Sequence, residues 1–130
     1  MTALGEMIVS LVLSDAPTIA LIGNRLYPSK ITEGEAQPSV SFFIVNTTSV
    51  YAQGTSATFF RSRVQFDCWG ISASSASGVA SALMTLMNGY NGTVLSKRIW
   101  SILLEDRFTT YEQDAELCRE SMDFIFTYTL

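Results

Sequence analysis

Residues 61–69, RSRVQFDCW, and residues 119–128, RESMDFIFTY, decide the fold of this chain. In both stretches apolar side chains alternate with polar or charged ones, which is the two-residue period of a β-strand with one buried face. The side chains predicted to face a core are Val64, Phe66, Cys68, Met122, Phe124, Phe126 and Tyr128. Those predicted to face the other way are Arg61, Arg63, Gln65, Asp67, Trp69, Arg119, Ser121, Asp123 and Thr127.

Both strands thus carry charge on the face that points away from the core. If the strands pair or lie close together, an arginine of one can meet an aspartate of the other across the sheet. We expect Arg63, Asp67, Arg119 and Asp123, with Arg61 beside them, to form a charge network within the sheet or at a subunit contact. The alternative is an ordinary solvated sheet face.

The remaining elements follow from periodicity and from start and stop signals. Helical spacing predicts an amphipathic first helix over residues 3–14, and DAPTIALIG (15–23) predicts a short second helical turn followed by a brief edge strand, RLYP. Residues 39–50 and 58–69 predict a hairpin around the loop 52–57. The main helix is expected between Ser72 as N-cap and Gly89 as stop. Residues 93–106 and 115–130 predict two more strands, joined by the polar segment 107–114.

The predicted fold class is therefore α/β (α+β), a mainly antiparallel sheet of about four or five strands packed with an N-terminal helix and one main central helix. With 130 residues and no linker or repeat, residues 1–130 are expected to form a single domain.

Composition excludes several functional classes. A net charge of −4 without a basic run argues against a protein that grips nucleic acid. No apolar run reaches membrane-spanning length and Glu6 stands where a signal peptide would be positive, so we expect a cytoplasmic product with no membrane partner. Cys68 and Cys118 are expected to be reduced core thiols.

An enzymatic function is not expected. The chain has no histidine, which removes Ser-His and Cys-His nucleophile pairs and the common zinc sites, and we expect no cofactor and no metal. Glu105 and Asp106 are adjacent on a predicted strand, so their side chains would point apart and not act as a carboxylate pair.

The main helix lacks charge where a monomer would normally carry it. No charged residue lies between Asp67 and Lys97. The small polar side chains on the outer side of this helix, which mark a candidate subunit interface, are Ser74, Ser75, Ser77, Ser81 and Thr85. The alternative is a serine-rich helix exposed to solvent.

The order of several short motifs resembles the tail-completion, or tail-terminator, family of long-tailed phages. The matching stretches are the early segment DAPTIALIGNRLYP (15–28), the strand RVQFDCW (63–69), and the strand SMDF (121–124) after an acidic loop that contains Tyr111. Asn24 departs from the pattern, in which an aspartate is more usual. The resemblance covers most of the chain.

This resemblance implies a non-enzymatic virion protein, assembled in the host cytoplasm, that forms a ring, typically hexameric, at the head-proximal end of the tail tube. Such a ring ends tube growth and joins the tail tube protein to a head-tail connector or stopper protein, while DNA passes through without specific binding. A ring needs two unlike patches, and the uncharged helix and the charged sheet face are candidates. Edge strands and the hairpin loop 52–57 could extend the sheet into a neighbour.

The segment 105–123 carries seven acidic residues against two arginines, a local net charge of −5, which leaves +1 for the rest of a chain of −4. In a ring, such a segment would repel phosphate if it lined the lumen, or would meet a basic partner if it faced outward. The residues assigned to this lumen or partner face are Glu105, Asp106, Glu112, Asp114 and Glu116. The alternative to a virion protein is a small ligand- or peptide-binding module of a cytoplasmic protein.

Overall fold

The computed structural model describes residues 2–29, 36–51, 58–113 and 116–130 as one sheet covered by helices on one side. Its six strands lie in the order β1-β2-β3-β6-β5-β4, and every neighbouring pair is antiparallel except β1 and β2. The elements in chain order are α1 (Ala3–Leu13), α2 (Ala16–Ile22), β1 (Leu26–Pro28), β2 (Ser39–Tyr51), β3 (Thr58–Gly70), α3 (Ala73–Met87), β4 (Gly92–Val94), β5 (Lys97–Glu112) and β6 (Leu117–Thr129).

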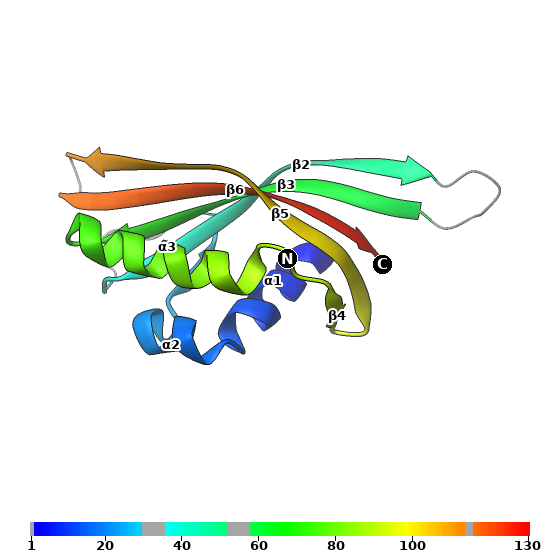
Figure 1. Ribbon diagram of the computed structural model, residues 1–130, viewed down its shortest axis with the longest axis horizontal. Helices are drawn as coiled ribbons and strands as arrows, with labels where there is room; N and C mark the ends of the chain where they lie inside the picture. The colour runs from blue at the N-terminus through cyan, green and yellow to red at the C-terminus, as the bar shows by residue number, and fades with distance from the viewer. Residues whose placement is uncertain (1, 30–35, 52–57, 114–115) are drawn as a thin grey trace.

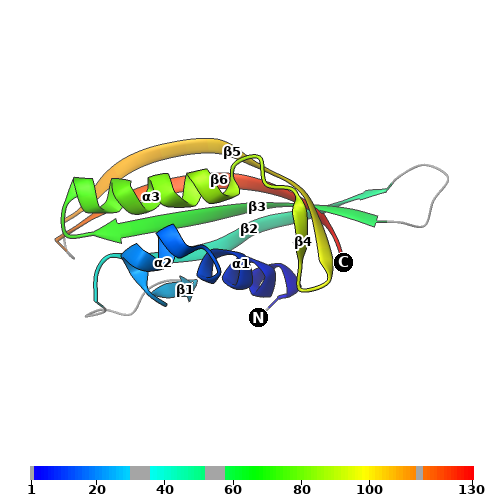
Figure 2. The same cartoon turned by 60° about the horizontal axis from the view of Figure 1, so that its bottom comes forward.

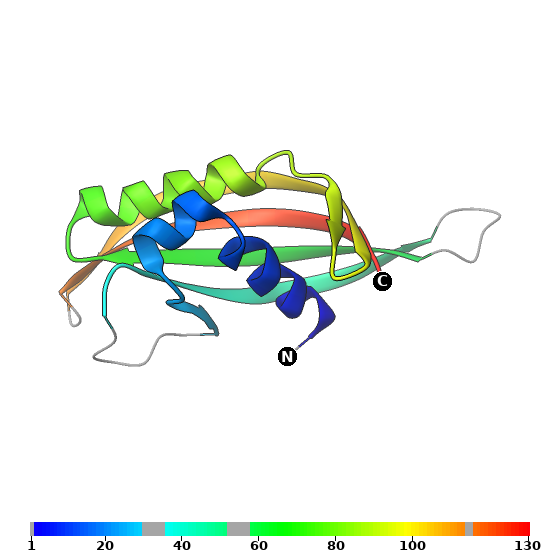
Figure 3. The ribbon, with the colours of Figure 1, turned by 90° about the horizontal axis from the view of Figure 1, so that it is seen from below.

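The three helices lie together on one side of the sheet, and the other side carries no helix (Figure 1). α3 packs along β3 and β6, while α1 lies beside it over the β2 side of the sheet (Figure 3). Within the described residues no single helix is long and apolar enough to span a membrane; α1 and α2 would qualify as a pair bent by 90°, by length and composition only.

The core forms between the helices and the sheet because β3 and β6 align their apolar sets. Phe66 lies opposite Met122 and Val64 opposite Phe124, and all four side chains are fully buried. Phe66 also stacks on Phe42 at 5.7 Å and meets Phe124 edge-on at 5.7 Å. The alternation predicted from the sequence is therefore confirmed in both strands.

The helices begin and end where local chemistry predicts. Thr2 and Ser72 cap α1 and α3 by accepting a hydrogen bond from the backbone N–H three residues on, at 3.1 Å in both cases. Gly89, at φ 83°, follows the end of α3 and takes a conformation that a residue with a Cβ rarely adopts. The three predicted helical segments and the brief strand at residues 26–28 are confirmed.

The region after α3 differs from the expected pair of strands. Residues 93–106 are not one strand: β4 ends at Val94, and Leu95 and Ser96, at φ 51° and 66°, turn the chain into β5. β5 then continues through Glu112, so the segment expected to be a polar connection is strand, consistent with the aromatic and β-branched residues at positions 108–111. The described sheet therefore has six strands where about four or five were expected.

The β2–β3 hairpin extends beyond the helical layer as an arm, formed here by residues 45–50 and 59–62 (Figure 2). The first residue of the arm, Val45, forms a β-bulge, and residues 45–50 are exposed one after another because neither face of β2 is covered there. On the helix side of the arm, hydroxyls join the strands: Ser62 Oγ lies 2.8 Å from Thr47 Oγ1 and 2.9 Å from Tyr128 Oη.

Gly70 marks a close approach that a larger residue would disturb. A Cβ at this position would lie 2.7 Å from the backbone nitrogen of Ala76, in the first turn of α3. We expect Gly70→Ala to lower the free energy of unfolding by about 1–3 kcal/mol, as overpacking does. The matched control is Gly78→Ala, because Gly78 is exposed within α3 with no atom within 4 Å of its added Cβ; this change should stabilise the protein by about 0.5–1 kcal/mol. Denaturant titration of both variants measures the difference, and equal effects would contradict it.

Candidate functional site

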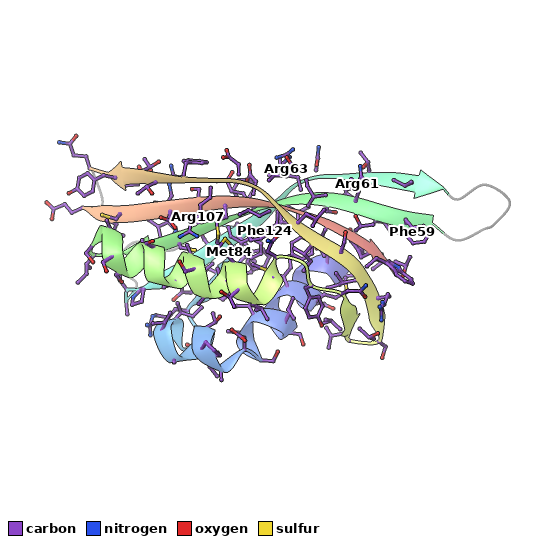
Figure 4. The ribbon with its side chains drawn as sticks, viewed as in Figure 1. Phe59, Arg61, Arg63, Met84, Arg107 and Phe124 are labelled. Atoms are coloured by element: carbon purple, nitrogen blue, oxygen red, sulfur yellow. The ribbon has the colours of Figure 1, made fainter. Side chains whose placement is uncertain are left out.

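The side of the sheet away from the helices, called the open face below, carries the charged residues singled out in the sequence. Figure 4 shows Arg61 and Arg63 on this side, and Arg107 and Met84 on the helix side. The open face also carries exposed apolar side chains, including Phe43, Leu103 and Phe108, which are 40%, 56% and 44% exposed. It is thus a mixed apolar and charged surface, of a kind common in protein contacts.

Arg63 on β3 and Asp123 on β6 form the cross-strand pair that the sequence predicts. Arg63 Nη1 lies 3.5 Å from Asp123 Oδ2, and its Nη2 lies 4.0 Å from Glu105 Oε2 on β5. Arg63 is more than a third exposed, so solvent weakens both contacts and they add little stability. Their effect is to orient Arg63 across three strands.

Asp67 and Arg119, the other two members of the expected network, take different partners. Asp67 Oδ1 accepts hydrogen bonds from Ser121 Oγ at 2.6 Å and from Gln65 Nε2 at 3.0 Å. Arg119 pairs with Glu112 at 2.8 Å and lies over the Trp69 ring at 5.6 Å. The register explains this, because it sets Asp67 opposite Ser121 and Arg119 opposite Trp69. An arginine meets an aspartate across β3 and β6 once, at Arg63 and Asp123.

Asp123 sits in an unfavourable electrostatic environment. It lies directly opposite Asp106 in the β5–β6 register, and its Oδ1 is buried without a hydrogen-bond partner. Partial burial, followed by the charges of Asp106 and Asp67, raises the pKa of the Asp123 carboxyl, although Arg63 opposes the shift. The folded protein therefore favours a protonated Asp123 more than the unfolded chain does.

Three of the residues assigned to a lumen or partner face, Glu105, Asp106 and Glu112, lie on the open face of β5. Glu105 is the extra residue of a β-bulge and contacts Arg63, while Asp106 lies on the open face opposite Asp123. Glu112 pairs with Arg119 near the end of β5, and Glu116 is exposed in the turn before β6. Asp114 lies outside the described residues.

Arg107 and Glu120 form the most buried ion pair of the described residues, and sequence reasoning missed it. Glu120 is 6% exposed on the helix side of β6. Arg107 of β5 donates from Nε to Glu120 Oε2 at 2.6 Å and pairs with the same carboxylate through Nη2. The signal was present: Glu120 is two residues before Met122 and so shares its core-facing side.

The same Arg107 ties the sheet to α3. Its Nη2 lies 3.3 Å from Ser81 Oγ and 3.4 Å from Ser77 Oγ, and its Nη1 lies 3.6 Å from Met84 Sδ. Two hydroxyls that the sequence assigned to a subunit interface thus contact this chain's own arginine. Ser74, Ser81 and Thr85 are nevertheless exposed on the neutral side of α3, and Ser77 is half-buried.

Two open hollows lie on opposite sides of the molecule. One, of about 470 Å³, lies between α2 and α3 and is lined by Pro17, Ala82, Leu86 and neighbouring polar residues. The other, of about 380 Å³, lies on the open face where bulged β2 and β5 flank the inner strands β3 and β6, and its polar lining includes Asn46, Thr48, Arg61, Arg63 and Glu105.

Both cysteines are free, Cys68 buried and Cys118 half-buried. Burial, followed by the nearby charges of Glu120 and Asp67, raises the pKa of the Cys68 thiol, so Cys68 is held as an unreactive thiol. Among the described residues no group of three or more His, Cys, Asp or Glu side chains could hold a metal ion.

Comparison with known proteins adds a likeness of fold. No protein-family model matches this chain, and no curated protein matches it. Among solved structures, a chain described as "Virion of native gene transfer agent (GTA) particle" superposes with a TM-score of 0.74 at 15% sequence identity, and the match covers 100% of both chains. At this identity the likeness shows that the two chains share a fold over their whole length.

Removing Arg107 should destabilise the protein strongly. Arg107→Ala leaves the Glu120 carboxylate buried without its cation and frees α3 from the sheet, so we expect a loss of about 3 kcal/mol in the free energy of unfolding. Arg61→Ala is the control, because Arg61 is exposed on β3 and its loss should cost less than about 0.5 kcal/mol. Urea denaturation followed by circular dichroism measures both. Equal stability of the two variants would contradict the role of the ion pair.

Asp123 should give stability a measurable dependence on pH. Because its pKa in the folded protein is raised above the ordinary value of 3.8, its contribution to stability is greatest at low pH and falls as pH rises through that value towards the folded-state pKa. Asp123→Asn should remove this part of the dependence, whereas Glu6→Gln, an exposed control, should keep it. Denaturant titrations between about pH 3 and pH 7 test this, and an unchanged slope in Asp123→Asn would refute it.

Proposed function

We propose that this chain is a structural virion protein that forms a ring, most simply a hexamer, at the head-proximal end of a phage tail tube. The ring ends tube growth and joins the tail tube protein to a head-tail connector or stopper protein. The observation that carries the proposal is the full-length likeness of fold to a chain of a gene transfer agent virion. The order of the sequence motifs resembles that of the tail-terminator family, and this supports a position at the head-proximal end of the tail tube.

The sheet has two outer edges, along β2 and along β5, that differ from each other and can contact other copies. β1 pairs with β2 at residues 40–42 only, and β4 pairs with β5 at residues 97–99 only. Among the described residues the outer edge of β2 from Phe43 onward and that of β5 from Glu105 onward have no strand partner. Long unpaired edges are sites where another chain adds a strand. Because the edges differ in sequence, copies that met through them would form a heterologous contact, which is the kind that builds rings.

The two halves of the sheet also differ in charge. The strand β2 carries no charged residue and its neighbour β3 carries Arg61 and Arg63 before Asp67, whereas the segment 105–123 has a net charge of −5. Opposite charges would steer one copy onto the next and disfavour contact between like edges.

DNA would pass such a ring without being held. On the open face, Arg63 and Arg119 are paired with carboxylates of the same chain. Cations that are already paired release few counterions when phosphate approaches, so attraction to DNA would be weak. A lumen or partner position for the acidic residues remains part of this proposal.

The alternative of a small ligand- or peptide-binding module would use the hollow between α2 and α3, the one that Ser81 and Thr85 border. Its lining offers no group of convergent charged side chains among the described residues, and it is open to solvent. The mass of the purified protein separates the two functions, because a binding module of this kind needs no ring.

We expect closed rings when the protein is concentrated or mixed with isolated tail tubes. Negative-stain electron microscopy should show rings, and multi-angle light scattering should give a mass that is a multiple of 14.3 kDa. The rings should cap one end of each tube and halt addition of tube subunits. A strict monomer that never joins tube ends would refute the proposed function.

A further inference from the structure

Asp106 on β5 and Asp123 on β6 oppose each other directly on the open face. They are register partners in an antiparallel pair, and side chains in this position have Cβ atoms about 4.5–5.5 Å apart. Both point away from the core, because the next residue on β5, Arg107, contacts α3 and the previous residue on β6, Met122, is buried. The backbone therefore holds two carboxyl groups side by side, where two negative charges repel each other.

The other charged groups around Asp123 leave one of its two oxygens without a partner. On β3, Arg63 contacts Oδ2 at 3.5 Å, and the carboxylate of Asp67 is already occupied by two side-chain donors. On β5, Glu105 contacts Arg63 at 4.0 Å. Asp123 Oδ1 is buried and has no hydrogen-bond partner among the described residues. A proton on this oxygen would have the carboxylate of Asp106 as the acceptor on the opposite strand.

Asp106 is a suitable acceptor for that proton. Within the described residues no arginine or lysine pairs with it, and its Oδ1 accepts a hydrogen bond from the backbone N–H of Arg107 at 2.9 Å. Burial and then the charge of Asp106 are among the causes that raise the pKa of the Asp123 carboxyl. A neutral Asp123 would replace the repulsion by a hydrogen bond, as when two neighbouring carboxyl groups share one proton.

The two aspartates lie where β5 is attached on one side only. Glu105, the residue before Asp106, forms a β-bulge. Beyond it β5 pairs with β6 but has no strand on its outer side in the described part of the chain, because β4 pairs with residues 97–99 only. The same segment carries Arg107, which contacts Glu120 and α3. An attraction or repulsion between the aspartates therefore acts on an edge segment, residues 105–112.

We propose that Asp106 and Asp123 form a proton switch that sets how tightly residues 105–112 of β5 are attached to the sheet. Protonated Asp123 donates a hydrogen bond from Oδ1 to the Asp106 carboxylate and joins the two strands beside the bulge. When both groups are ionised, their repulsion loosens the segment. Because folding raises the pKa of Asp123, attachment is strongest at low pH and weakens as pH rises through the folded-state value.

The switch does not depend on the ring, although residues 105–112 include the outer edge through which copies would meet in the proposed function. Hydrogen exchange of the wild-type protein measures the attachment. After correction for the intrinsic pH dependence of exchange, the backbone amides of residues 105–112 should be protected about two- to fivefold more when Asp123 is protonated. The amides of β3 should change less, and Asp123→Asn should remove the difference.

Carbon-13 NMR titration of the Asp123 carboxyl tests the role of its partner. Asp106→Asn removes the opposing charge, so the midpoint for Asp123 should move to lower pH. The matched control is Glu105→Gln, which removes the same charge from the adjacent residue and should move the midpoint less.

Three results would overturn the switch: no shift in Asp106→Asn, equal shifts in Asp106→Asn and Glu105→Gln, or wild-type protection of residues 105–112 that does not vary with pH. None of these results bears on whether rings form. A wild-type protein that titrates as expected but never self-associates or joins tube ends would instead remove the proposed function and keep the switch.

Discussion

The antiparallel register between β3 and β6 is the constraint on which the rest of the structure depends. It sets Phe66 against Met122 and Val64 against Phe124, so two apolar rows merge into one buried surface under α3. A shift of the register by one residue would move Gln65 and the charged side chains of the open face into the core. The same register fixes the open face, because every side chain excluded from the core on these strands must appear there.

The register also buries the Glu120 carboxylate, and Arg107 neutralises its charge. Glu120 shares the core-facing side of β6 with Met122, so its carboxylate is buried at the margin of the helical layer. An unpaired charge there would be costly, and β5 supplies the cation from the residue opposite Met122. Because α3 presents small residues at this place, the guanidinium fits between helix and sheet, and one ion pair both neutralises Glu120 and holds α3.

The sequence predicted what depends on local periodicity and missed what depends on register. Alternation identified the buried rows of β3 and β6, and capping residues located α1 and α3, because each signal lies within a few adjacent residues. Leu95 and Ser96 turn the chain at positive φ without the glycine or asparagine that usually marks such a turn, so the end of β4 was missed. Whether Arg119 meets Asp67 or Glu112 depends on which residues lie opposite each other, and neither strand shows this alone.

Three β-bulges in the described part of the chain bear on the ring proposed for this fold. Val45, Trp100 and Glu105 are extra residues on β2 and β5, the two strands whose outer edges are only partly paired, and each bulge bends its strand and increases the local twist. A heterologous contact closes into a ring only when the rotation between neighbouring copies divides a full turn, and otherwise it builds an open helix. In the proposed ring, where copies meet through the two edges of the sheet, the angle between those edges would set that rotation. The bulges contribute to this angle, so they would contribute to the number of copies that close the ring.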